Sequence, residues 1–338
     1  MRSAIAGALV LLAACGPAGA PAPEPGTTAE ERLATMPPQP LPTGATFVFY
    51  NTENLFDTID DTGRGDDDLT PLGRLAWTGE RYRTKLQRLG EAVRLSGDAW
   101  PVLVGLAEVE NRGVVEDLSR GADLLGAHYT VVHFDSPDER GIDVALLVDP
   151  GHYRVAASAP IAVELPGDRT RDILHATLHG ATDTLEVFVN HWPSRREGEA
   201  ESAPKRMAAA TTLRKAVESL PERHRVLIMG DLNDTPLDRS VQEGLGAGCS
   251  RQAALVDLMC LDQPEGRGSH QYQGEWAYLD QFIVDRDLLA HVEGAAALWD
   301  ERLLFRHPRY GLSPDKTYSG DRYKGGYSDH LPVVLRLK

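Results

Sequence analysis

The segment Val226-Leu227-Ile228-Met229-Gly230-Asp231-Leu232-Asn233-Asp234 carries the clearest structural signal in this chain. Four consecutive apolar residues bounded by polar ones are typical of a buried strand. Asp231 and Asn233 follow that run and stand two positions apart, so their side chains face the same way if the extended backbone continues. The segment therefore predicts a buried strand that delivers an acid and an amide to one edge of a sheet.

The same arrangement recurs along the chain, because other polar clusters also lie at the end of an apolar run. These clusters are Asn51 after 47–50, Glu108 after 102–107, 140–143 before 144–148, 190–193 after 185–189, 279–281, and 328–330. Polar groups at neighbouring strand ends meet at one rim of a sheet. The order of these clusters predicts a single site assembled from distant parts of the sequence.

The pattern of elements favours an α/β fold. We expect strands at 46–50, 102–107, 129–134, 144–148, 173–178, 185–189, 226–229, 279–284 and 331–337, and helices at 77–95, 114–125 and 203–220. Several strands follow one another without a helix between them, which favours two packed, mostly antiparallel sheets flanked by helices. The glycine-rich phosphate loops of Rossmann and P-loop proteins are absent from the sequence, so those folds are excluded.

The first 15 residues have the build of an export signal. Met1-Arg2 supplies a positive charge, and the apolar stretch 5–14 is shorter than the roughly 20 residues of a membrane span. Leu12-Ala13-Ala14-Cys15-Gly16 resembles the lipobox of bacterial lipoproteins, in which the cysteine is acylated. We expect an exported lipoprotein anchored through Cys15 to the outer membrane, facing the periplasm or the exterior; an ordinary cleaved signal is the alternative.

Residues 16–44 are rich in proline and alanine and read as an extended linker. Residues 45–338 form the expected folded domain, which is long enough to bury a sizeable core. Its two cysteines, Cys249 and Cys260, are eleven residues apart and can form a disulfide in an oxidising compartment. Two free thiols are the alternative.

The formal net charge of −15 counts against a scaffold that binds nucleic acid non-specifically. It does not count against an enzyme, because a bound cation and local arginines reverse the charge at a site. We expect Arg140, Arg171 and Arg195 to contact a substrate phosphate.

Carboxylate oxygens are the ligands that Mg²⁺ prefers, and one or two suffice because this ion keeps several waters. Glu108 and Asp329 are the natural pair, with the amide oxygen of Asn51 nearby. The sequence predicts a Mg²⁺ site, with Mn²⁺ or Ca²⁺ as alternatives.

The remaining polar groups suit water-driven cleavage of a phosphate ester. Asp231 can orient a water or accept its proton, and the amide of Asn233 can donate to a phosphoryl oxygen. His330 is the candidate acid, with Asp280 as the carboxylate that orients it, and His191 is a second imidazole for a phosphoryl oxygen. Each residue alone is explained equally well as a cap or turn residue; the ordered set is not.

This ordered set resembles the endonuclease/exonuclease/phosphatase superfamily over about residues 46–338. The resemblance rests on Gly230–Asp234, on 328–333 (Ser-Asp-His-Leu-Pro-Val), and on 51–57 (Asn-Thr-Glu-Asn-Leu-Phe-Asp). It implies a four-layer α/β-sandwich and Mg²⁺ dependence. It also implies metal-site roles for Asn51, Glu108 and Asp329, and catalytic roles for His191, Asp231, Asn233, Asp280 and His330.

We expect a metal-dependent phosphodiester hydrolase, a secreted or membrane-anchored nuclease that acts as a monomer on nucleic acid without a protein partner. A phosphatase or phospholipase-type esterase acting on small or lipid phosphates is the alternative. Ala107 stands where the apurinic-endonuclease branch has glutamine, which disfavours DNA repair. A lipoprotein that binds without cleaving is a third reading, but none of the expected catalytic groups is missing from the sequence.

Overall fold

The computed structural model describes residues 44–61, 63–181, 183–196, 198–261, 263 and 266–338. The predicted signal, the lipid-bearing Cys15 and the predicted linker up to residue 43 lie outside the described residues. Within the described part, no helix combines the length and the apolar composition needed to cross a membrane.

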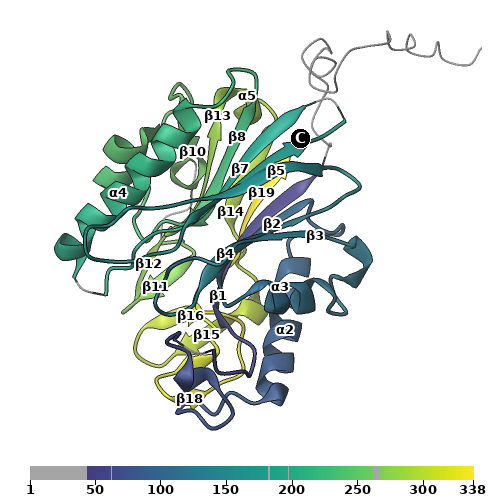
Figure 1. Cartoon of the computed structure of the whole chain (residues 1–338), viewed down its shortest axis with the longest axis vertical. Coiled ribbons are helices and arrows are strands. Elements are labelled where there is room, and N and C mark those ends of the chain that lie inside the picture. Colours follow the sequence, from purple (N-terminus) through teal and green to yellow (C-terminus); the bar gives the residue numbers. More distant parts are fainter. Residues whose placement is uncertain (1–43, 62, 182, 197, 262, 264–265) are drawn as a thin grey trace, which may run out of the picture. The chain divides into compact units, whose positions relative to one another are not determined.

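Two large mixed sheets form the centre of the fold (Figure 1). The six-stranded sheet has the order β14 (Val292–Ala297), β19 (Val333–Leu337), β1 (Thr46–Leu55), β2 (Leu103–Val109), β4 (Asp143–Val148) and β3 (Thr130–His133). The seven-stranded sheet has the order β5 (Arg154–Ile161), β6 (Ile173–His179), β7 (Thr184–His191), β8 (Arg225–Asp231), β13 (Asp280–Asp285), β10 (Leu255–Asp257) and β9 (Ala247–Gly248). Only the pairs β1–β2, β7–β8 and β9–β10 are parallel, so the prediction of mostly antiparallel sheets is confirmed.

The two sheets pack face to face across a shared apolar core. They are in close contact at Gly105 in β2, where an added Cβ would lie 2.4 Å from the sulfur of Met229 in β8. Residues of β7 alternate between this core and the outer face: Leu185, Val187 and Val189 point inward, while Phe188 points outward.

Helices cover the outer faces and complete the four layers (Figure 1). Helix α4 (Glu199–Glu218) packs Ala209, Ala210 and Leu213 against the outer side of the seven-stranded sheet. Helices α2 (Gly79–Arg94) and α3 (Arg112–Ser119) contribute to the core of the other sheet. The α/β-sandwich predicted from the sequence is confirmed.

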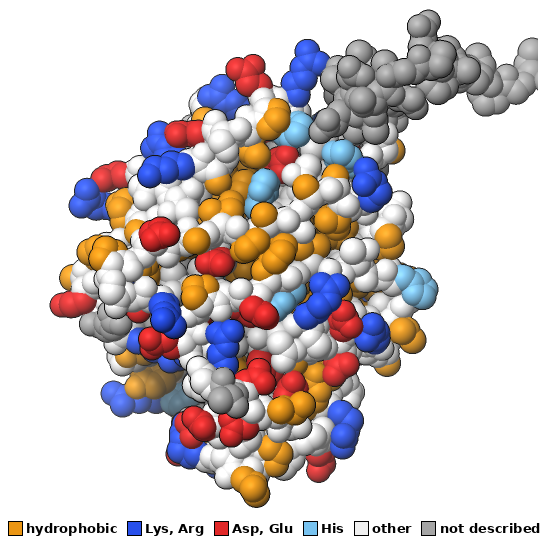
Figure 2. All heavy atoms as spheres, viewed as in Figure 1, with side chains coloured by type: hydrophobic (Ala, Val, Ile, Leu, Met, Phe, Trp, Pro, Cys, Tyr) orange, Lys and Arg blue, Asp and Glu red, His pale blue; other side chains and the backbone are white. Residues whose placement is uncertain are grey.

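Some element boundaries differ from the prediction. The side chain of Thr78 caps α2 as expected, but α3 ends at Ser119 rather than at 125, and a separate 3-10 turn (Leu125–Ala127) follows. Helix α4 starts at Glu199 and carries Pro204 inside it. The sequence does not predict strand β5, because its exposed residues show no alternation of apolar and polar side chains. The face of the molecule viewed in Figure 2 carries hydrophobic side chains across its middle.

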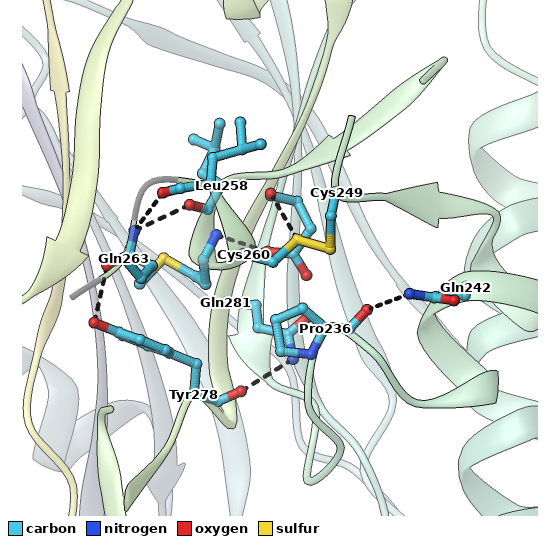
Figure 3. The surroundings of a disulfide bond; sticks show 11 residues. Pro236, Gln242, Cys249, Leu258, Cys260, Gln263, Tyr278 and Gln281 are labelled. Atoms are coloured by element: carbon cyan, nitrogen blue, oxygen red, sulfur yellow. Dashed lines mark hydrogen bonds between the residues drawn. A yellow bond between two sulfur atoms is a disulfide. The ribbon is translucent and has the colours of Figure 1, made fainter. Parts of the chain in front are cut away.

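The structure joins Cys249 and Cys260 in a disulfide beside β10 (Figure 3). Closing a loop of this length stabilises a fold by about 3 kcal/mol in the chain-entropy model. Gln263 reinforces the region, since its side-chain amide donates to the carbonyl of Leu258 (3.1 Å) and accepts from the Tyr278 hydroxyl (2.9 Å). The disulfide and these bonds anchor the segment that leads into the hairpin β11 (His270–Tyr272) and β12 (Glu275–Ala277).

Candidate active site

The predicted site residues converge at one edge of the two sheets, around a cleft of about 770 Å³. Strand register explains the convergence on the seven-stranded side. His191 of β7 and Asp280 of β13 both lie directly beside Asp231 of β8, so the three residues form one cross-strand row. Asn51, Glu108 and Asp329 line the same cleft from the six-stranded side.

His330 and Asp280 form a buried pair. The Nδ1 atom of His330 lies 2.7 Å from Oδ2 of Asp280, and its Nε2 atom lies 3.8 Å from Oδ2 of Asp231. Burial lowers the pKa of His330, but the charges of Asp280, Asp231 and Asp329 outweigh it and hold that pKa well above its ordinary value. The imidazolium is therefore the favoured form, with its Nε2 proton directed toward the cleft.

Asp231 is held by two donors. Its Oδ2 atom accepts from the Asn51 amide at 3.0 Å, and its Oδ1 atom accepts from the backbone N–H of Asn233 at 2.9 Å. Burial raises the pKa of Asp231 to about 6, with a further contribution from Asp280. A carboxylate with a pKa close to neutrality is suited to accept a proton.

His191 differs from His330 although both are buried in the same cleft. Burial, together with the charges of Arg171, Arg140 and His330, holds the pKa of His191 well below its ordinary value. Its Nε2 atom lies 3.6 Å from Oδ2 of Asp231 and 4.0 Å from Oε1 of Glu108. His191 is thus a neutral imidazole that can donate one hydrogen bond into the cleft.

The carboxylates on the six-stranded side fit a hard divalent cation. Glu108 accepts from the backbone N–H of Asn54 at 3.1 Å through Oε2, and its Oε1 atom has no closer cationic neighbour than Arg140 at 3.6 Å. Among the described residues, no hydrogen bond reaches the carboxylate of Asp329. Burial raises the pKa of Asp329, but the charges of His330 and His270 outweigh it and hold that pKa below its ordinary value. Oxygens with spare acceptor capacity are the donor set that Mg²⁺ requires.

Backbone strain concentrates at the site. Asn54, Glu108 and Asn233 have φ values of 60°, 60° and 51°, in the left-handed region that non-glycine residues rarely occupy. Such conformations cost about 1–3 kcal/mol each and cluster at functional sites. The strained backbone turns the backbone N–H of Asn54 toward Glu108 and the backbone N–H of Asn233 toward Asp231.

The three predicted phosphate-binding arginines have different environments. Arg140 lines the cleft and donates to Oδ1 of Asn54 at 2.6 Å. Arg195 also lines it, but its guanidinium is engaged by the Asn233 carbonyl (2.6 Å) and by Asp234 (2.7 Å).

Arg171 does not line the cleft, so the structure gives no support to its predicted contact with a substrate phosphate. It is buried, pairs with Asp138 at 2.9 Å, and donates to the carbonyls of His191 (3.2 Å) and Trp192 (2.6 Å). Because two of these bonds go to the carbonyls of His191 and Trp192, Arg171 fixes the backbone that carries His191.

Sequence reasoning missed several residues of the cleft. His270 lies on β11 with its ring 4.7 Å from that of His330, and burial together with the charge of His330 lowers its pKa to about 4. Tyr272 of the same strand lines the cleft. The segment around His270 lacks an apolar run, and only its contacts with the rest of the fold reveal its place.

A second missed residue is Lys85, which lies on α2 and looks like a surface lysine in the sequence. It is buried and donates to Oγ1 of Thr317 (2.5 Å) and to the carbonyl of Tyr327 (2.7 Å). Burial lowers the pKa of Lys85 to about 8, against the charges of Glu53 and Asp329. Lys85 thus compensates negative charge beneath the carboxylates of the cleft.

A family model described as the Endonuclease/Exonuclease/phosphatase family matches residues 46–338 of this chain. No curated protein sequence matches this chain. Among solved structures, humanized D. rerio TDP2 is 16% identical, with 87% of this chain and 98% of that chain covered and a TM-score of 0.56.

The structure of D. rerio TDP2 complexed with single strand DNA product is 15% identical, with the same coverage of 87% and 98% and a TM-score of 0.56. The mannosyl-6-phosphatase of Bacteroides thetaiotaomicron VPI-5482 is 15% identical, with 87% of this chain and 99% of that chain covered and a TM-score of 0.54. At these identities the structural likeness shows the fold alone.

Proposed function

The chain belongs to the endonuclease/exonuclease/phosphatase family, and from this premise we propose that it is an exported, Mg²⁺-dependent phosphodiesterase that cleaves nucleic acid. The observation that carries the proposal is the row His191–Asp231–Asp280 with His330 beside it, facing Glu108 and Asp329 across one cleft. A proton acceptor, a proton donor and a set of cation ligands are thus within reach of one phosphate.

The cation, when bound at Glu108, Asp329 and Asn51, would neutralise charge on the phosphoryl oxygens. The chain's own groups handle the protons. Asp231 accepts the proton of a water whose oxygen forms the new bond to phosphorus, and the bond to the leaving oxygen breaks on the opposite side. His330 donates through Nε2 to an oxygen that gains negative charge, and Asp280 holds its ring in place.

His191 and Asn233 complete the contacts to the phosphate. The neutral imidazole of His191 donates one hydrogen bond to a phosphoryl oxygen. The amide of Asn233 already donates one hydrogen to the carbonyl of Trp192 at 2.9 Å, and its second hydrogen serves the phosphate. His191 ends β7 beside Asp231 of β8, and Asn233 follows two residues after Asp231 with its amide on the Trp192 carbonyl, so their spacing is preset.

Nucleic acid is the preferred substrate class because of the cleft and not because of the fold. The names of the structural neighbours include a protein with single strand DNA product and a mannosyl-6-phosphatase, so this fold accommodates both. The cleft of about 770 Å³ is lined by Arg140, Arg195 and Arg196, which suits a substrate that extends beyond one phosphate. A phosphatase acting on small phosphates is the second candidate. It is favoured by Glu199 and Glu275, which also line the cleft, because their negative charges repel a long polyanion more than a small phosphate.

Export and lipid anchoring through Cys15 form part of the proposal. The apolar stretch behind Met1-Arg2 and the lipobox-like segment before Gly16 support it. The disulfide between Cys249 and Cys260 adds independent support, because disulfides persist in oxidising compartments.

The test is cleavage of supercoiled plasmid and of single-stranded oligonucleotides by the purified protein in Mg²⁺, beside an EDTA sample and the His330→Ala variant. We expect cleavage that requires both Mg²⁺ and His330. If neither nucleic acid is cleaved while a small phosphomonoester is, the phosphatase candidate replaces the nuclease.

A further inference from the structure

We propose that Tyr272 forms a stacking subsite for a nucleobase at the mouth of the cleft, so that the enzyme engages unpaired bases next to the phosphate it cleaves. The subsite rests on the proposed phosphodiesterase function and narrows its substrate to nucleic acid with accessible bases. Tyr272 is 69% exposed, although it lines the cleft that holds the catalytic groups.

The hairpin β11–β12 fixes the direction of the Tyr272 side chain. Its register pairs His270 with Ala277 and Tyr272 with Glu275. These four residues line the cleft, which agrees with the alternation of side chains along a strand.

The intervening residues lie on the other face of the hairpin. Trp276 packs on Trp299 with ring centroids 4.4 Å apart, and Gln271 donates to the carbonyl of Tyr310 at 3.3 Å. The tight turn at Gln273 and Gly274, with φ values of 52° and 104°, closes the hairpin. One face is therefore anchored to the protein, and the other is presented to the substrate.

The position of Tyr272 relative to the reacting groups corresponds to a neighbouring nucleotide. His270 lies against His330, and the backbone N–H of Leu331 donates to the carbonyl of Ser269 at 2.7 Å, so the start of β11 is tied to the catalytic segment. Two residues of antiparallel strand span about 7 Å. Tyr272 thus stands one step outward from His270, on the same face and toward the rim.

The chemistry around Tyr272 suits a base better than a second phosphate. Among the described residues, no aromatic ring or cationic group stacks on its ring, and its hydroxyl accepts a hydrogen bond from the Gln273 amide at 3.0 Å. Glu275, directly across the hairpin, carries a negative charge that repels phosphate. The arginines of the cleft lie on other segments, so phosphate binding and base stacking are assigned to different walls.

The experiment compares two single-stranded oligonucleotides of equal length and charge, one with all its bases and one with abasic residues flanking the cleaved linkage. Cleavage is measured with the wild type, Tyr272→Ala, Tyr272→Phe and Gln271→Ala. The last variant is the matched control, because it changes the face of the same hairpin that points away from the cleft. Thermal unfolding of each variant verifies that it is folded.

We expect the wild type to prefer the base-bearing substrate by roughly tenfold in kcat/KM, mainly through KM, since stacking on an aromatic side chain strengthens binding by about that factor or more. Tyr272→Ala should lose the preference and cleave both substrates as the wild type cleaves the abasic one. Tyr272→Phe and Gln271→Ala should retain it.

Equal cleavage of both substrates by the wild type, or a preference that survives in folded Tyr272→Ala, would overturn the subsite while leaving the phosphodiesterase intact. Failure of the wild type to cleave either substrate would instead overturn the proposed function, and the subsite with it.

Discussion

The two sheets contribute different chemistry to the same cleft. The six-stranded sheet carries the proposed oxygen ligands: Asn51 lies in β1 just before its register shifts against β2, and Glu108 lies near the end of β2. The seven-stranded sheet supplies the row of titratable groups formed by His191, Asp231 and Asp280. In the proposed mechanism, cation binding and proton transfer are thus assigned to two different sheets that share one core.

The dipeptide Asp329-His330 contributes to both halves. Asp329 faces the ligand side, whereas His330 reaches Asp280 of the seven-stranded sheet at 2.7 Å. The backbone bends at Asp329, just before β19, and this single segment serves both sides. The comparison teaches that variants in one half should alter metal dependence, and variants in the other should alter the catalytic rate at saturating metal.

The largest effect should follow from removing the proton acceptor of the seven-stranded half. We expect Asp231→Asn to lower kcat by roughly 10²–10⁴-fold, because the amide cannot take a proton, while the Mg²⁺ concentration for half-activation stays unchanged. Steady-state kinetics across a Mg²⁺ titration measure both quantities. A variant that regains full kcat at high Mg²⁺ would contradict the proposed division between the sheets.

A smaller effect should follow from weakening the ligand half. Glu108→Gln keeps the shape of the side chain but removes a charge from the cation site. We expect the half-activating Mg²⁺ concentration to rise roughly 10–100-fold, with much of kcat restored at saturation. Isothermal titration of Mg²⁺ into the wild type and the variant provides a second readout, and equal affinities would remove Glu108 from the site.

Arg171 tests whether a residue outside the cleft affects the rate only by positioning residues that line it. Replacing it with methionine leaves Asp138 as a buried, unpaired carboxylate, which costs about 3–5 kcal/mol of stability. We expect a clearly lower Tm and a several-fold loss of kcat, because the carbonyls of His191 and Trp192 lose their donor. The Arg171→Met, Asp138→Leu double variant should recover most of the Tm, and a Tm unchanged by Arg171→Met would contradict this role.

The smallest effect on activity is expected at Asp257 in β10, which is buried in the seven-stranded sheet. Burial raises its pKa to about 7, against about 3.9 for an unfolded aspartate, so the folded protein retains a proton that the unfolded chain releases. The free energy of unfolding therefore falls as pH rises from about 4 to about 7, by up to roughly 4 kcal/mol, and stays low above that range.

Asp257→Asn should remove this pH dependence. Its side-chain oxygen still accepts from the backbone N–H of Met259, as Oδ1 of Asp257 does at 2.8 Å. We expect higher stability than the wild type at pH 8 and unchanged kcat. Denaturant unfolding at pH 5 and pH 8 measures the difference, and parallel pH curves for the two proteins would refute the raised pKa.

Several of the predicted site residues that line or adjoin the cleft share one property: they lie at or next to the end of a strand of the two large sheets. Asp231 and Asp280 are recognisable because buried apolar runs mark the strands, and the polar residue at the end then has no other explanation. The pairing of His330 with Asp280 joins the two sheets, because His330 precedes β19 of the six-stranded sheet while Asp280 begins β13 of the seven-stranded one.

The missed residues depend on contacts that have no local signal. His270 and Tyr272 lie on a three-residue strand, which is too short to show a period, and Trp276 on Trp299 holds the hairpin in place. Lys85 is an ordinary helix residue until packing against 317–327 buries it. Arg171 was assigned to the substrate because residue type does not reveal that Asp138, 33 positions earlier, takes its guanidinium.

The close approach of the sheets at Gly105 has a consequence for the tolerance of the catalytic distances. Because a Cβ there would meet Met229 of β8 and Phe49 of β1, position 105 leaves no room for a side chain between the ligand half and the proton-transfer half. The separation of the two sheets therefore sets the distance between the cation site and the proton acceptor. Enlarging a side chain far from the cleft would change the distance between cation and proton acceptor before it changed the fold.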